Sequence, residues 1–282
     1  MIVVKVGGSL GPDRSNILED FAYNIQNLDE KFIFVHGGGP DIDKVSNLLN
    51  LPVEIVRSPT GIESRHTTKE TIKALTVALR GFVNPSIVAR LTQLGVPAIG
   101  LSGVDGCIVT GRRKTAIKVA HNNGIQIRRD GYTGIIDSVN AKLLLSFTDQ
   151  KLLPVLSPPA MDIESGPINV DADRMAAAVA GAVGAHTLII LTNTPGLLAD
   201  VNDQASLLTS VDAHQFSDAK ILAKGRMKLK LLAAEEALSS GVKKVIIADG
   251  RIAKPISAAL GGAGTHISAT CLEEVGEGEH VF

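Results

Sequence analysis

The sequence predicts an α/β protein with an open, mainly parallel β-sheet sandwiched by helices, arranged as two lobes with one inserted β-hairpin. Short β-branched runs recur along the 282 residues, and each leads into a stretch with apolar residues at three- and four-residue spacing. This alternation is typical of a parallel sheet with helices on both faces. Hydrophobic residues make up 45% of the chain but aromatic residues only 3%, so aliphatic side chains are expected to fill the core.

Six runs have the length and the β-branched content of buried strands. They are Ile2–Val6, Phe32–Val35, Ala98–Leu101, Leu153–Leu156, Thr187–Leu191 and Val245–Ile247. Four of them end in glycine or polar residues. This is the edge at which open α/β sheets bind their ligands, so we expect the functional site there.

Seven stretches between the strands show the apolar spacing of helices. They are Asn16–Leu28, Ile42–Leu49, Thr68–Leu79, Pro85–Leu94, Ser138–Phe147, Ala172–Val183 and Met227–Leu238. Three short segments break the rhythm and predict an inserted hairpin around the turn signal Asn122-Asn123-Gly124. These segments are Ile108–Arg113, Ala116–Val119 and Gly124–Arg129. A hairpin inserted into an α/β chain usually serves an interface or a lid.

The chain is expected to divide into an N-terminal lobe of residues 1–168 and a C-terminal lobe of residues 169–282, with the boundary near Gly166–Asp171. No long linker separates them, so the lobes should pack closely. The last stretch, Ser268–Phe282, is acidic and contains glycine, and we expect a peripheral or frayed tail there.

Composition narrows the possible partners. The net charge of −1 and the pI near 6.7 provide no global field toward DNA or an anionic membrane, and few aromatic residues are present for base stacking. Cys107 and Cys271 have no zinc-site spacing and fit a reduced compartment. We expect a cytoplasmic protein without a nucleic-acid or membrane partner and without a metal held by protein ligands.

The first strand leads into Val4-Lys5-Val6-Gly7-Gly8-Ser9. Glycines here let the backbone approach a ligand, and successive N–H groups can cradle phosphate oxygens. Lys5 would add a positive charge beside them. No GxxxxGK[ST] motif occurs in the chain, and a strand that ends in a tight turn stays an alternative interpretation.

The second strand leads into His36-Gly37-Gly38-Gly39-Pro40-Asp41. Three consecutive glycines cost conformational entropy, which a site that needs bare N–H donors would explain. The helix predicted to follow would point its positive end at the same place and favour an anionic ligand. The alternative is a flexible loop.

Three later segments contain candidate binding residues. Arg65 lies on a loop before a helix, and its guanidinium suits a carboxylate, although a surface ion pair would explain it equally. In Asn169-Val170-Asp171-Ala172-Asp173, the first aspartate fits a helix N-cap, while Asp173 could orient lysines by ion pairing. The loop Thr192-Asn193-Thr194-Pro195-Gly196-Leu197 follows a buried strand, as a nucleotide-binding loop would.

Taken in order, KVGGS, HGGGP, the Arg65 loop, NVDAD, TNTPGL and GRMKLKLLAA resemble the amino acid kinase family, in its N-acetylglutamate-kinase-like branch, over roughly residues 1–267. The resemblance implies the amino acid kinase (carbamate kinase-like) fold. It also implies that Lys5 and Lys230 stabilise the transition state and that Asp173 organises them. Lys230 is chosen over Lys228 because the family pattern places the lysine three residues after the methionine, here Met227.

The same resemblance implies the remaining site residues. The acyl substrate would be held by Gly38, Gly39, Arg65 and Asn169, the phosphoryl group approached by Gly7 and Gly8, and the nucleotide bound by Thr192, Asn193, Gly196 and Leu197. The implied cofactors are ATP and Mg²⁺, with the metal held mainly by the nucleotide. A homodimer formed through the N-terminal lobe is also implied.

A finer resemblance concerns the acceptor. Ser64-Arg65-His66-Thr67-Thr68 is similar to the SRYTD pattern of the [LysW]-aminoadipate kinases, although His66 and Thr68 depart from its Tyr and Asp. It implies phosphorylation of 2-aminoadipate or glutamate carried by the small acidic protein LysW, in lysine or arginine biosynthesis. The nearest alternative is an N-acetylglutamate kinase that acts on the free amino acid derivative. A non-catalytic amino-acid-binding regulator is disfavoured because both lysines are present, and a dinucleotide-dependent oxidoreductase because no GxGxxG follows the first strand.

The predicted hairpin region supports an acidic partner. Residues 112–130 carry a local charge of +5, while the remaining chain sums to −6. The basic residues are Arg112, Arg113, Lys114, Lys118, Arg128 and Arg129, against the single acid Asp130. Such segregation steers an acidic macromolecule at low salt. The alternative is a solvated hairpin without a partner.

Overall fold

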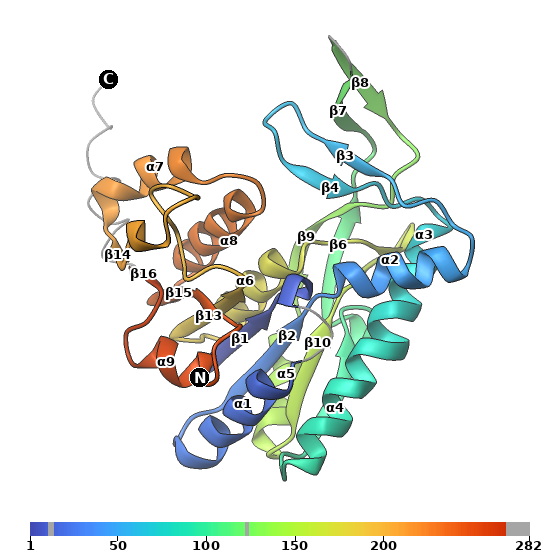
Figure 1. Cartoon of the computed structure of the whole chain (residues 1–282). Helices are drawn as coiled ribbons and strands as arrows, with labels where there is room; N and C mark the ends of the chain where they lie inside the picture. The colour runs from blue at the N-terminus through green and yellow to red at the C-terminus, as the bar shows by residue number, and fades with distance from the viewer. Residues whose placement is uncertain (11–13, 122–123, 269–282) are drawn as a thin grey trace, which may run out of the picture.

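An eight-stranded sheet forms the centre of the protein in a computed structural model that describes residues 1–10, 14–121 and 124–268 (Figure 1). The strand order is β14-β16-β15-β13-β1-β2-β10-β5, and every neighbouring pair is parallel except β15 and β16. The bounds are β1 Ile2–Val6, β2 Phe32–His36, β5 Ala98–Ser102, β10 Leu153–Ser157, β13 Thr187–Thr192, β14 Ser210–Val211, β15 Lys244–Asp249 and β16 Thr265–Ser268. The open, mainly parallel sheet and all six predicted strands are confirmed, whereas β14 and β16 were not predicted.

Helices cover both faces of this sheet (Figure 1). One face packs against α1 (Ser15–Asn27), α4 (Asn84–Gln93) and α9 (Pro255–Leu260), and the other against α5 (Ala141–Asp149), α6 (Ala172–Ala182) and α8 (Met227–Ser239). Alternate residues of β1 face opposite sides, so Val4 belongs to the first core and Val3 to the second. Lys5 therefore points to the side covered by α6 and α8.

The chain from Thr71 to Gln93 forms one helical run, where the sequence predicts two helices. The run consists of α3 (Thr71–Thr76), the π-helical turns η2 (Val77–Val83) and α4. The amide of Asn84 donates to the carbonyl of Leu79, five residues earlier. Helical hydrogen bonds therefore reach Pro85, which has no N–H to donate, and α4 continues after it. This run is long and apolar enough to cross a membrane, but core helices of globular proteins can be equally long and apolar. Its Leu75 and Leu91 are buried in the fold.

A second, four-stranded sheet and two hairpins complete the fold, and the hairpins lie at one end of the molecule (Figure 1). The sheet has the order β12-β11-β6-β9, with β6 Val109–Arg113, β9 Gly134–Val139, β11 Ala160–Asp162 and β12 Gly166–Ile168. The hairpins are β3 (Ile55–Arg57) with β4 (Glu63–Arg65) and β7 (Ile117–His121) with β8 (Gly124–Arg128). The inserted hairpin is confirmed as β7–β8, but the predicted segment Ile108–Arg113 pairs with β9 and β11 instead of joining it. The turn residues 122–123 and the predicted tail, residues 269–282, lie outside the described residues.

Two helix predictions need correction for identifiable reasons. The helix predicted from Ser138 begins at Ala141, because β9 extends to Val139 and the side chain of Asn140 caps α5 by accepting from Leu143 N. Helix α7 (Ala213–Leu222) was not predicted, although Asp212 and Gln215 form a capping box at its start. The remaining short elements are α2 (Gly39–Leu48) and the 3₁₀ turns at Gly8–Leu10, Asp105–Cys107 and Gln204–Ser206.

The sheet order bears on the two predicted lobes. Strands β1, β2, β5 and β10 precede residue 169 and form one half of the sheet, while β13, β14, β15 and β16 follow it and form the other. The halves meet where β1 pairs with β13 along its whole length. The division into lobes stays a prediction, and this junction is where residues from both halves can meet.

Candidate active site

Lys5 and Lys230 share one carboxylate, that of Asp173. The Nζ of Lys5 lies 2.6 Å from Oδ1, and the Nζ of Lys230 lies 2.9 Å from Oδ2. The three side chains are 6–8% exposed. The sequence thus predicted correctly which residues meet, although they come from β1, α6 and α8. Together they leave one net positive charge in a buried place.

Electrostatics explains why this cluster is stable. Burial by itself would raise the pKa of Asp173, but the charges and hydrogen bonds of Lys5 and Lys230 overcome it and hold that pKa well below its usual range. Burial lowers the pKa of Lys230, the charge of Lys5 lowers it further, and Asp173 opposes both. The ionised aspartate is therefore what keeps two ammonium groups close together.

Local sequence positions the aspartate. Asp171 caps α6, because its Oδ1 accepts hydrogen bonds from the amides of Asp173 and Arg174, as the sequence predicts. Helices α6 and α8 approach closely, since a Cβ on Gly181 would lie 2.5 Å from the Cβ of Ser240. The helices are thus closely packed at their carboxyl ends, while Asp173 and Lys230 meet near their amino ends.

Two glycine loops meet beside the lysines. A Cβ on Gly8 would lie 2.5 Å from the backbone nitrogen of Gly39, and one on Gly38 would lie 2.7 Å from Cδ2 of Leu79. No side chain fits at position 8, where it would meet backbone, and one at position 38 would have to displace the buried side chain of Leu79. Bare backbone therefore borders the site, and α2 starts there at Gly39 with its positive end.

The buried side chain of His36 contacts the second glycine loop. The imidazole is fully buried, with Nδ1 3.1 Å from the carbonyl of Gly37 and Nε2 3.0 Å from Nδ2 of Asn84. Because the Asn84 amide also donates to the carbonyl of Val155, Nε2 accepts and Nδ1–H donates, which defines a neutral ring. Burial lowers the pKa of His36 to about 3, and the charges of Arg14 and Lys5 add to the lowering. The sequence alone did not reveal this role of His36.

A cavity of about 220 Å³ leads from the loop after β13 to Lys230. The predicted nucleotide-binding residues all line it. Its wall comprises Thr192, Asn193, Thr194, Gly196, Leu197, Leu198, Val201, Leu222, Ala223, Lys224, Arg226, Met227 and Lys230. The loop is held by Thr265, whose Oγ1 accepts from the amide of Leu197 at 2.8 Å. A ligand in this cavity would reach the lysine pair from the C-terminal half.

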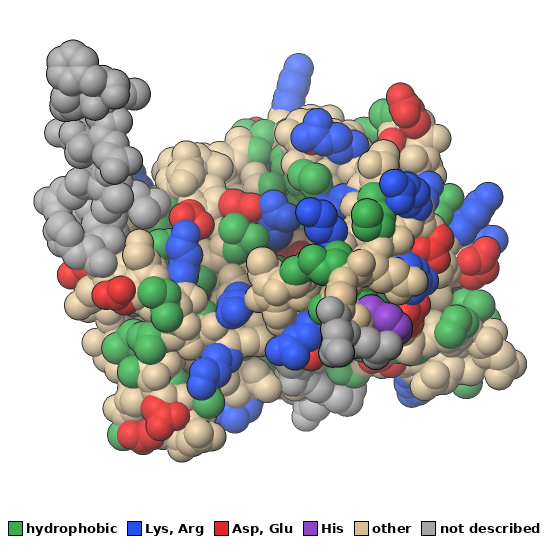
Figure 2. Space-filling view, turned by 90° about the horizontal axis from the view of Figure 1, so that it is seen from above, with side chains coloured by type: hydrophobic (Ala, Val, Ile, Leu, Met, Phe, Trp, Pro, Cys, Tyr) green, Lys and Arg blue, Asp and Glu red, His purple; other side chains and the backbone are tan. Residues whose placement is uncertain are grey.

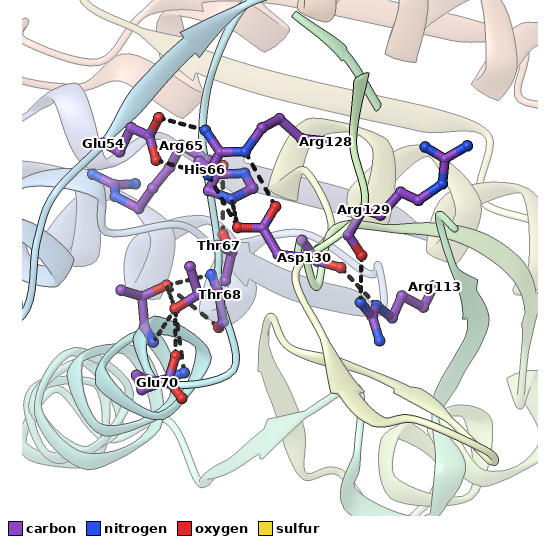
Figure 3. A network of polar contacts seen from close by, with 12 residues as sticks. Glu54, Arg65, His66, Thr67, Thr68, Glu70, Arg113, Arg128, Arg129 and Asp130 are labelled. Atoms are coloured by element: carbon purple, nitrogen blue, oxygen red, sulfur yellow. Dashed lines mark hydrogen bonds and ion pairs between the residues drawn. The ribbon is translucent and has the colours of Figure 1, made fainter. Parts of the chain in front are cut away.

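Arg65 and Asn169 contact the second glycine loop and Thr67, and Figure 3 shows Arg65 and Thr67 side by side in the chain. The Nη2 of Arg65 bonds Oδ1 of Asp43 and, at 3.3 Å, the carbonyl of Gly39, so this arginine is tied to the glycine loop. The Nδ2 of Asn169 donates to Oγ1 of Thr67 at 2.8 Å. Both residues thus contact the chain around Gly39 and Thr67.

The model of the amino acid kinase family matches residues 1–249 of this chain. The chain belongs to the amino acid kinase family. It is accordingly a phosphotransferase, as the sequence predicts, and the lysine pair, glycine loops and cavity are its candidate active site.

Several family members resemble it over nearly their whole length. It is 42% identical over 268 residues to the [LysW]-aminoadipate kinase of Deinococcus radiodurans, covering 95% of this chain and 91% of that protein. It is 41% identical to the enzyme of that name from Thermus thermophilus, covering 94% and 99%. It is 39% identical to the [LysW]-aminoadipate/[LysW]-glutamate kinase of Metallosphaera sedula, covering 95% and 100%.

Solved structures confirm the family fold. A protein from Streptococcus mutans superposes with a TM-score of 0.75 at 25% identity, covering 95% of this chain and 98% of that one. Carbamate kinase of Giardia superposes with a TM-score of 0.67 at 14% identity, covering 95% and 98%. The second likeness concerns the fold alone.

The six predicted patch residues do not form one uniform basic surface, and seen from above the Lys and Arg side chains are interspersed with acidic and hydrophobic ones (Figure 2). Arg113 donates to the carbonyls of Gly131 and Arg129 and lies 4.2 Å from the ring centroid of Tyr132. Arg128 pairs with Glu54 and Asp130, and these hydrogen bonds raise its pKa.

The other four patch residues differ in their surroundings. Arg112 lies 3.5 Å from Asp137, and Lys114 is half-buried with a pKa lowered by burial and then by Arg174. Lys118 and Arg129 are exposed, and within the described residues no hydrogen bond or ion pair engages their side chains.

His66 fills a buried position between β4 and the base of the hairpin (Figure 3). Its Nε2 lies 3.1 Å from Oδ2 of Asp130. Hydrogen bonds from Arg128 and His66 lower the pKa of Asp130 well below its usual range. His66, which replaces the Tyr of the SRYTD pattern, therefore joins the chain after Arg65 to the hairpin.

The geometry predicts different results for the two lysines at the start of α8. Lys230→Ala should lower kcat by about 10²-fold or more, because it removes a preorganised cation from developing charge, and Lys5→Ala should do the same. Lys228→Ala is the control, since its Nζ donates to the carbonyl of Thr60, and turnover should stay within about threefold. Steady-state ADP release measures the effect. Near-normal turnover of Lys230→Ala would contradict the assignment.

The buried neutral His36 predicts an acid-sensitive fold. Its pKa is lower in the folded chain than in the unfolded chain, so the stabilisation is complete above about pH 6.5 and is lost as the pH falls toward 3. Urea unfolding of wild type and His36→Gln at several pH values measures it. The wild-type free energy of unfolding should fall more steeply below pH 6.5, by up to about 1.4 kcal/mol per pH unit. Equal slopes would show that His36 does not titrate as described.

Proposed function

We propose that this phosphotransferase moves the terminal phosphoryl group of ATP to the side-chain carboxylate of 2-aminoadipate, glutamate or both, attached to the small acidic carrier protein LysW. A carboxylate oxygen of the acceptor forms a bond to the γ-phosphorus, the bond from that phosphorus to the β,γ-bridging oxygen breaks, and the products are an acyl phosphate and ADP. The reaction would belong to lysine or arginine biosynthesis. The names of the relatives support the acceptor.

One observation carries the chemistry: Lys5 and Lys230 share Asp173 at the place where two bare glycine loops meet the end of a cavity. Phosphoryl transfer needs positioning and charge neutralisation rather than a protein nucleophile. Two ammonium groups fixed by one carboxylate supply that charge without rearrangement. N–H groups of the glycine loops supply donors.

The nucleotide would lie in the cavity, with Thr192, Asn193, Gly196 and Leu197 around it. Gly7 and Gly8 would approach its terminal phosphate. The acceptor carboxylate would come from the side of Gly38, Gly39, Arg65 and Asn169. In this arrangement Lys5 and Lys230 stabilise the transferring group, and Asp173 keeps them in place.

We infer that Mg²⁺ accompanies ATP and is ligated mainly by phosphate oxygens and water. Both oxygens of Asp173 are engaged by lysines, and the described residues contain no group of three or more His, Cys, Asp or Glu side chains placed to hold a metal. When bound, the metal would neutralise part of the negative charge of the phosphates. The protein itself provides cations and N–H donors.

We further propose a cytoplasmic homodimer. Cytoplasmic residence rests on the composition of the chain. The dimer rests on large exposed apolar side chains of the N-terminal half, Leu48, Val77 and Phe82, which are 71%, 44% and 60% exposed. Light scattering in solution would measure twice the mass of the chain, whereas a single-chain mass would exclude the dimer.

Acceptor assays test the function directly. Carrier-linked aminoadipate, carrier-linked glutamate and free N-acetylglutamate are each supplied with ATP and Mg²⁺, and the acyl phosphate is trapped with hydroxylamine. Turnover of one or both carrier-linked substrates is expected. Turnover of only the free acid would instead support the alternative, an N-acetylglutamate kinase.

The free cations of the hairpin region predict how the carrier binds. The double variant Lys118→Glu, Arg129→Glu should raise the KM for the carrier-linked substrate about tenfold at low salt, and the effect should shrink when salt shortens the Debye length. The KM for ATP should not change. Lys243→Glu is the matched control, because it reverses an exposed charge just before the amino end of β15, away from the site. Equal increases in both KM values would contradict carrier docking at this hairpin.

A further inference from the structure

Arg226 lies between the cavity and the second glycine loop. It directly precedes α8 and lines the cavity together with Lys230. Its guanidinium nitrogens Nη1 and Nη2 are 4.0 Å from the position that a Cβ would have on Gly39. The arginine comes from the C-terminal half of the chain, whereas Gly39 belongs to the N-terminal half, so its guanidinium spans the junction of the two halves.

The guanidinium is free to bind a ligand. Arg226 is exposed, and within the described parts of the chain neither a hydrogen bond nor an ion pair engages its side chain. The carbonyl of the neighbouring Gly39 already accepts a hydrogen bond from Arg65. The donors of the Arg226 guanidinium are therefore left for a ligand.

The neighbouring cations are used differently. Lys230 is buried and ion-paired, and Lys228 donates to the carbonyl of Thr60 in the loop of the β3–β4 hairpin. Arg226 therefore differs from both in presenting its unpaired donors to the cavity and to the glycine loop at once. Its planar fork matches two oxygens of one phosphate, which a lysine cannot do.

We propose that Arg226 is a further catalytic residue, which binds the terminal phosphate of the nucleotide and stays on the phosphoryl group during transfer. This rests on the proposed function, because it assumes a nucleoside triphosphate in the cavity. The phosphates must pass from the cavity to the lysine pair, and Arg226 lies on that path beside Gly39. With Lys5 and Lys230 it makes three cations around the transferring group.

Nucleotide affinities measured without any acceptor test this assignment. Calorimetry with Mg²⁺ compares ADP with a non-hydrolysable ATP analogue in wild type, Arg226→Ala and Arg226→Lys. Arg226→Ala should bind the triphosphate analogue about 10- to 100-fold more weakly than wild type, because it loses a charge-assisted pair of hydrogen bonds. Binding of ADP should weaken less than about threefold, and Arg226→Lys should lie between wild type and Arg226→Ala.

Controls separate this role from folding and from the proposed function. Lys220→Ala removes one exposed cation that pairs with Glu235 and should leave both affinities unchanged. If Arg226→Ala unfolds, as judged by circular dichroism, Arg226→Lys carries the comparison. Unchanged binding of the triphosphate analogue, or equal losses for both nucleotides, would overturn the assignment. If wild type binds neither nucleotide, the proposed function fails instead.

Discussion

The candidate active site depends on one buried carboxylate. Asp173 accepts both Lys5 and Lys230, and these side chains are nearly inaccessible to solvent. Without the aspartate, two like charges would lie together in a place of low dielectric constant, which is costly. The three residues come from β1, α6 and α8, so the sheet must be complete and the two helices closely packed before the cluster exists. The same packing that stabilises the fold therefore also sets the positions of these three side chains.

Around this cluster the protein offers positive charge and backbone donors. The glycine loops approach so closely that side chains are excluded, and His36 stays neutral beneath them because both ring nitrogens are engaged in a buried position. A charged imidazole there would compete with the lysines for the anionic ligand. The cavity ends at Lys230 on one side. Arg65 and Asn169 contact Gly39 and Thr67 on the other. This two-sided access suits the meeting of a phosphoryl donor and a carboxylate acceptor.

Charge near the β7–β8 hairpin is divided between two tasks. Arg113 and Arg128 hold the base of the hairpin to Tyr132, Glu54 and Asp130, whereas Lys118 and Arg129 are left for solvent or a partner. His66 links the hairpin base to strand β4, which ends at Arg65 (Figure 3). A partner bound at the hairpin would thus contact a region directly connected to the acceptor side of the site.

By itself, the sequence determined the parallel sheet and its six core strands, and it predicted that Lys5, Asp173 and Lys230 would meet, as they do in the structure. Short β-branched runs and ordered motifs are local patterns, and they were sufficient to prefer Lys230 over Lys228, the lysine that contacts Thr60 instead of Asp173. Only the tertiary structure showed how the start of α9 is held: the amides of Ile256 and Ser257 donate to the carboxylate of Asp20, which lies 236 positions from Ile256 in the chain. It also decided which hairpin cations are free and that Arg226 lies beside Gly39. These features depend on contacts between distant segments, and local periodicity carries no information about such contacts.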